Sequence, residues 1–254
     1  MIFKITTPIP TAEKAFDWLF YSISCLDWYV ANNRSNRLDF FKNLNHPLIN
    51  DMMENRNLSK QDFRDKYFLT FKDTMYKQDV YISYIKKINE VLPIVQSCYS
   101  KVKDLQQNWG FEILNQYHID IDLFGVGGKY HRDEKNIGHV ILGAGNNWTD
   151  KDALAHIIVH EMIHLGIEDL LINPNHQKQP PVFQEEKERI VDNLCVFVTK
   201  ENIPNYKRKW KDGTCSRFQE LAKDYAYMDN VVGTQPLNNL VKAVQNFLKE
   251  NKRS

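Results

Sequence analysis

The chain has 254 residues, of which 43% are hydrophobic and 26% charged, and its 33 basic and 32 acidic side chains give a formal net charge of +1. This length suits one medium-sized domain whose core is large enough to fold without disulfides. The even charge balance disfavours nucleic acid and anionic membranes as partners. No apolar stretch approaches the ~20 residues of a membrane-spanning helix, and the N-terminus lacks a signal-peptide pattern, so the sequence predicts a cytoplasmic protein.

The four cysteines, Cys25, Cys98, Cys195 and Cys215, are widely spaced and form no CxxC pair. This spacing is typical neither of a disulfide framework nor of a thiolate zinc site. We therefore predict buried thiols, because cysteine is among the residues most often found in protein interiors.

The first hundred residues contain no glycine and indicate helices. One helix is predicted over 12–30 with Thr11 as its cap, and another begins after Ser59. A long helix is predicted over 79–108, because apolar residues recur there every three to four positions. Pro93 lies inside this stretch and should kink the helix or divide it.

A small sheet is predicted to follow these helices. Residues 118–123 alternate polar and apolar side chains, which is typical of a half-buried strand. The polar stretch 129–136 is predicted to be a loop, and 138–142 a returning strand. We expect these two strands to form a small antiparallel sheet.

Three more helices are predicted after the sheet, over 150–171 with Thr149 as its cap, over 183–199 and over 236–250. Taken with the preceding elements, they predict an α+β fold that is mostly helical.

Residues 160–164, within the helix predicted over 150–171, form the pattern HExxH. Residues four apart lie on one face of an α-helix, so the imidazoles of His160 and His164 can both reach one zinc ion. Glu161 can instead take a proton from the attacking water and pass it to the leaving group. The rest of this helix is apolar, and buried polar groups need partners. The motif therefore predicts a Zn²⁺ site with two histidine ligands and Glu161 as the general base.

His156 lies one further helical turn before His160. Three histidines on successive turns would span about 12 Å along the helix axis, too far for one tetrahedral ion. We therefore predict that His156 packs beside the site or supports a ligand.

The third ligand is expected from the helix predicted over 183–199, where Glu188 and Asp192 are four residues apart. The order HExxH…ExxxD resembles the gluzincin pattern of thermolysin-like peptidases and M1-type aminopeptidases. The resemblance implies that Glu188 completes the metal site and that Asp192 bonds the outer nitrogen of a ligand histidine. Glu186 and His176 stay open as alternative third ligands.

The resemblance covers about 135–195 and implies a zincin-like core, in which a backing helix, a small antiparallel sheet, a metal helix and a ligand helix follow one another. On this basis 1–116 is a helical N-terminal region that includes the backing helix, and 117–254 is the zincin-like metal-binding core. The resemblance also implies an edge strand, here 137–142, to which a substrate adds as a further strand. An oxyanion donor is expected downstream, and the candidates are Tyr206, Tyr225 and Tyr227.

The sequence therefore predicts a zinc metallopeptidase that acts on a peptide or protein substrate, and leaves its oligomeric state open. Two alternatives remain. One is a zinc-binding interaction protein without proteolytic activity. The other is an HExxH hydrolase of a non-peptide amide.

Overall fold

A computed structural model describes residues 3–31, 36–102, 111–125, 127–145, 148–172, 184–199 and 201–203. The fold is α+β and mostly helical, as the sequence predicts. The helices are α1 (Ala12–Ser24), α2 (Leu26–Ala31), α3 (Asn36–Leu44), α4 (Pro47–Glu54), α5 (Lys60–Thr74), α6 (Gln78–Ser100), α8 (Lys151–Ile172) and α9 (Gln184–Thr199). The strands are β1 (Lys4–Thr6), β2 (Gln116–Asp122), β3 (Gly128–Arg132) and β4 (Gly138–Gly143). The helix predicted over 236–250 lies outside the described residues.

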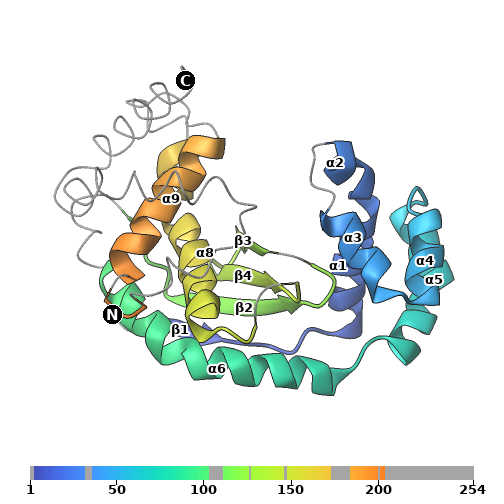
Figure 1. Ribbon diagram of the computed structural model, residues 1–254, viewed down its shortest axis with the longest axis horizontal. Coiled ribbons are helices and arrows are strands. Elements are labelled where there is room, and N and C mark those ends of the chain that lie inside the picture. The colour runs from blue at the N-terminus through green and yellow to red at the C-terminus, as the bar shows by residue number, and fades with distance from the viewer. Residues whose placement is uncertain are drawn as a thin grey trace.

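The strands form one mixed sheet in the order β1-β2-β4-β3 (Figure 1). β1 and β4 both run parallel to β2, whereas β3 is antiparallel to β4. The predicted antiparallel pairing of the two central strands is therefore wrong. The polar stretch predicted as a loop contains β3, which forms a hairpin with β4. Strands at a sheet edge often carry charged side chains, which is why this one has the composition of a loop.

The N-terminal helices follow the predicted caps, but two of them end earlier than predicted. Thr11 accepts a hydrogen bond from the Lys14 N–H at the start of α1, and Ser59 caps α5. The predicted helix over 12–30 is broken at Cys25, where the backbone leaves the helical region (φ −88°, ψ 2°). α6 runs through Pro93 without division and ends at Ser100.

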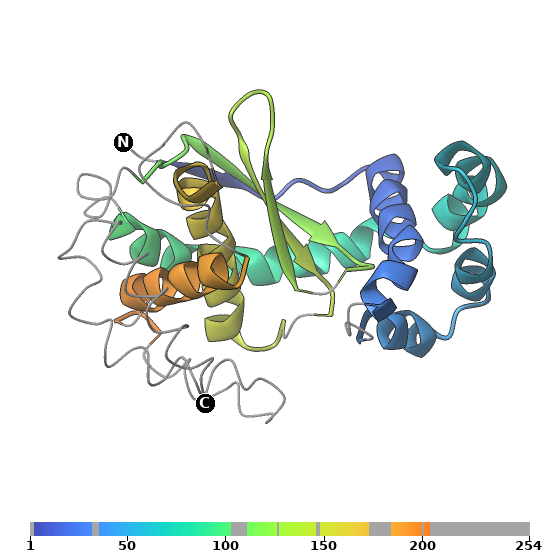
Figure 2. The ribbon, with the colours of Figure 1, turned by 90° about the horizontal axis from the view of Figure 1, so that it is seen from above.

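α8 is the buried helix around which this half of the molecule is built. It packs against β3 and β4 and also contacts α6 and α9 (Figure 1, Figure 2). Every residue from Leu154 to Ile167 is buried or half-buried, as expected for a helix that is apolar on nearly all sides. Its cap lies one position later than predicted, because the Asp150 carboxylate accepts hydrogen bonds from the backbone N–H groups of Asp152 and Ala153.

In the part of the chain that the structure describes, no helix has both the length and the apolar character needed to cross a membrane.

A buried carboxylate links the N-terminal helices to the sheet. Asp120 on β2 is fully buried and lies 2.8 Å from the Lys14 ammonium of α1 and 2.8 Å from Nδ1 of His139 on β4. The hydrogen bond to Asp120 raises the pKa of His139, although burial opposes this effect. The imidazolium of His139 is therefore favoured in the folded chain.

We predict that His139 stabilises the folded chain most at mildly acidic pH. Because its pKa is raised on folding, its contribution is fully present below the unfolded value of about 6.5 and is lost as the pH rises through the folded value. Urea unfolding of wild type and His139→Gln at about pH 5.5 and about pH 8.5 measures the effect. The difference in free energy of unfolding should be larger at the lower pH. Groups away from His139 are common to both proteins and cancel, whereas burial and His139 together lower the pKa of His118 and of His131, and the share of His139 in this effect reduces the expected difference at low pH. A difference that grows with pH would contradict the prediction.

Candidate metal centre

The two histidines of the HExxH motif and Glu188 meet between α8 and α9. Nε2 of His160 lies 3.1 Å from Nε2 of His164. Oε2 of Glu188 lies 3.6 Å from the first of these nitrogens and 3.5 Å from the second. One donor atom from each of three side chains therefore converges on a single point.

The spacing of these donor atoms suits a zinc ion. Three atoms separated by 3.1, 3.5 and 3.6 Å lie on a circle of radius about 2.0 Å, and Zn²⁺ binds nitrogen and carboxylate oxygen at roughly 2.0–2.2 Å. These three side chains would therefore hold one ion without a shift of the backbone. Two imidazole nitrogens and one carboxylate oxygen are also a known ligand set of catalytic zinc.

The neighbouring histidines favour the ionised carboxylate of Glu188, which is the form that binds a metal. Burial raises the pKa of its carboxyl group, but hydrogen bonds with His160 and His164 outweigh burial and lower the pKa well below its ordinary value. The carboxylate is therefore ionised at neutral pH, as a metal ligand must be.

Asp192 contacts the outer nitrogen of His160. Its Oδ1 lies 3.1 Å from Nδ1 of the histidine, and the carboxylate is almost completely buried. Such a contact fixes the tautomer of the imidazole and directs Nε2 toward the other donors. The outer nitrogen of His164 differs, because within the described residues it has no hydrogen-bond partner, and Oε2 of Glu168 lies 3.9 Å away.

Glu161 lies beside this group of donors and touches the sheet. Burial raises the pKa of Glu161 to about 7, with His160 acting in the opposite direction. A Cβ atom added to Gly128 on β3 would lie 2.2 Å from Oε1 of Glu161, so only glycine allows the strand to approach this carboxylate so closely. The neighbouring Gly127 has a positive φ of 74°, a conformation that favours glycine.

A second group of side chains, missed in the sequence, holds the ring of His164. Tyr130 on β3 stacks on this ring with centroids 4.5 Å apart and an interplanar angle of 9°. The Tyr130 hydroxyl donates a hydrogen bond to Glu168. Lys187, only 5% exposed, donates to the same hydroxyl at 2.9 Å and to Glu168 at 3.0 Å. Glu168 follows His164 by four residues and was detectable from that spacing, whereas Tyr130 lay in a stretch predicted to be a loop.

Several predicted site residues have no described side chain. His176 and the three candidate oxyanion donors, Tyr206, Tyr225 and Tyr227, lie outside the described residues. Glu186 lies in α9, but its side chain is not among those described. The predicted edge strand over 137–142 is wrong, because β4 lies between β2 and β3, and β3 is the outer strand on this side among the described strands.

Comparison with protein-family models, with curated proteins and with solved structures finds no match for this chain. Its function is therefore inferred from the chemistry of the site itself.

We predict that the purified protein takes up about one zinc per chain, because the donor set is that of a single zinc ion. His160→Ala, His164→Ala and Glu188→Ala each remove one of three ligands and should each lose the metal in elemental analysis. His131→Ala is a matched control, since successive side chains of a strand point to opposite faces and His131 is next to Tyr130. It should keep the metal.

No zinc in the wild type after the metal is added back would contradict the site as a whole. Zinc that is lost from His160→Ala but kept in Glu188→Ala would contradict the assignment of the third ligand only.

Proposed function

We propose that the protein is a zinc-dependent hydrolase that cleaves peptide bonds, with a zincin-like core of the gluzincin type. The observation that carries this proposal is the convergence of His160, His164 and Glu188 beside the buried carboxyl group of Glu161. Three ligands leave the fourth position of a tetrahedral zinc ion open to water or substrate. A purely structural zinc site has no use for a further carboxylate at this position.

In this proposal α8 is the metal helix, α9 the ligand helix and α6 the backing helix. The packing of α8 against α6, α9 and the sheet supports these roles. Two of the three ligands lie on one rigid helix and the third on its neighbour, so the donors keep their positions without a metal-dependent rearrangement of loops.

A bound zinc ion supplies Lewis-acid polarisation of the scissile carbonyl and lowers the pKa of water. Glu161 takes the proton from the attacking water and passes it to the leaving amine. Burial raises the pKa of its carboxyl group to about 7, which suits both transfers. A divalent cation nearby would shift the balance toward the base. Asp192 keeps the ring of His160 in place, and Tyr130 does the same for His164.

β3 is the strand to which we propose that the substrate adds. It pairs with β4 along one edge, and no other described strand pairs with its second edge. A peptide on that edge would pass Gly128, which touches Glu161, and Tyr130, which stacks on His164. Pairing through main-chain hydrogen bonds needs no particular side chains in the substrate.

Replacement of Glu161 by glutamine tests the general base. We expect the zinc-loaded wild type to cleave members of a mixed peptide library, and Glu161→Gln to keep its zinc but lose about 10²–10⁴-fold in rate, because it cannot accept the proton. Mass spectrometry of the digest, with zinc content measured on the same samples, gives both quantities. A zinc-loaded wild type that cleaves no peptide would contradict the peptidase. If it hydrolyses only small non-peptide amides, the result favours an amide hydrolase. If it hydrolyses nothing, the result favours a zinc-binding interaction protein.

Gly128→Ala tests the contact between β3 and the base. The added methyl group displaces the Glu161 carboxylate, and we expect cleavage to fall by about 10²-fold with zinc retained, the usual cost of a misplaced catalytic group. Gly127→Ala is the matched control, since its Cβ has no atom within 4 Å and its positive φ costs on the order of 1 kcal/mol of stability. The control should lower the melting temperature and leave the rate nearly unchanged. Equal rates in the two variants would count against this role of Gly128.

A further inference from the structure

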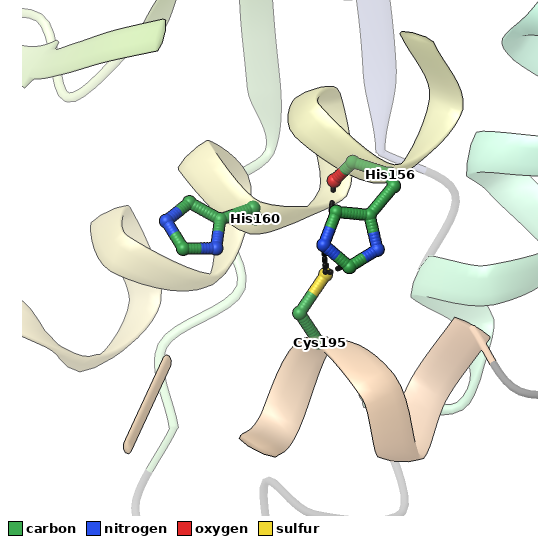
Figure 3. Close-up of side chains that lie close together, drawn as sticks. All are labelled: His156, His160 and Cys195. Atoms are coloured by element: carbon green, nitrogen blue, oxygen red, sulfur yellow. Dashed lines mark hydrogen bonds between the residues drawn. The ribbon is translucent and has the colours of Figure 1, made fainter. Parts of the chain in front are cut away.

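A second group of metal-binding side chains lies on the other side of His160. His156 precedes it by one turn on α8, and Cys195 faces both histidines from α9. Figure 3 shows the Cys195 sulfur directed from α9 toward the edge of the His156 ring, with the His160 ring beside it. Sγ lies 3.6 Å from Nδ1 and 3.7 Å from Nε2 of His156. One donor atom from each of the three residues lies within 4.8 Å of the others.

The spacing of sulfur and nitrogen suits a bound cation. A tetrahedral zinc ion with Zn–S of 2.3 Å and Zn–N of 2.0–2.1 Å places sulfur and nitrogen about 3.6 Å apart, which is the distance between Cys195 and His156. Cys195 is fully buried and His156 is 6% exposed, so an ion here would be held away from water.

The nitrogen of His160 that remains for this cluster is Nδ1, because Nε2 faces His164 and Glu188. Asp192 contacts the same Nδ1 at 3.1 Å, so a cation bound there replaces the proton that this nitrogen shares with Asp192. His160 therefore stands between two sets of donors, one with a carboxylate oxygen and the other with a sulfur.

We propose that His156, His160 and Cys195 form a second metal site, selective for soft, thiolate-preferring cations such as Cd²⁺ or Cu⁺. Thiolate and imidazole ligands favour these ions over hard cations such as Mg²⁺ and Ca²⁺. On binding, the metal–sulfur bond replaces the S–H bond of Cys195 and the metal–nitrogen bond replaces the N–H bond at Nδ1 of His160, and both protons pass to solvent. The site goes beyond the proposed hydrolase and does not depend on it, because two of its three ligands have no part in the first centre.

Titration of the full chain with Cd²⁺ tests the site through the ultraviolet charge-transfer absorption of a cadmium–thiolate bond. A variant with Cys25→Ser, Cys98→Ser and Cys215→Ser keeps only the thiol of Cys195. We expect this variant and the wild type to show the band, with saturation at one thiolate-bound Cd²⁺ per chain, and Cys195→Ser to lack it. His156→Gln should weaken Cd²⁺ binding at least about tenfold.

A further variant separates the two metal sites. His164→Ala removes a ligand of the first centre only and should keep the cadmium–thiolate band, whether or not the protein proves to be a hydrolase. Circular dichroism checks that each variant is folded. A band that persists unchanged in Cys195→Ser overturns the proposal. The absence of the band from the folded variant that keeps only the thiol of Cys195 also overturns the proposal. This second result can be read even if Cys195→Ser does not fold.

Discussion

The pairing of polar side chains on a buried helix is the constraint on which the site depends. α8 is enclosed from Leu154 to Ile167, yet this stretch carries three histidines and a glutamate. Polar groups without partners in such a place cost several kcal/mol each. α9 supplies the partners, because Glu188 and Asp192 both face the histidines. The packing of one helix on the other therefore fixes the chemistry between them.

Strand β3 of the sheet forms the third side of the site, next to α8 and α9. β3 approaches the Glu161 carboxylate at a glycine and covers His164 with the ring of Tyr130. Lys187 ties this strand to both helices, since it bonds Tyr130 and Glu168 from α9. A hydrogen-bonded network of this kind is strong when every member is satisfied, and it keeps the strand at a fixed distance from the helix pair. The Glu161 carboxylate and β3, the outer strand on this side of the described sheet, are thereby held side by side.

Features set by neighbours in the chain were predictable, whereas those set by distant contacts were not. The bounds of α8 and α9 and the caps at Thr11 and Ser59 follow from local periodicity and side-chain chemistry. The four-residue spacing within each helix likewise places the ligand candidates on one face. The short strand β1, the polar strand β3 and the parallel pairing of β2 depend on segments far apart in the sequence. The edge strand was misassigned for the same reason, and Tyr130 was overlooked with it.

The charged residues at the start of α9 show why composition alone does not predict which side chains of a helix are buried. Charge runs are usually solvated, but Lys187 and Asp192 are buried, since Ile190, Val191 and Leu194 anchor this side of α9 against the core. Apolar side chains fix the rotation of the helix, and that rotation brings Glu188, Asp192 and Cys195 to α8. A hard oxygen donor and a soft sulfur donor thus lie on one helix, with His160 between them. Any change in the packing of α9 on α8 must therefore alter both sets of donors together.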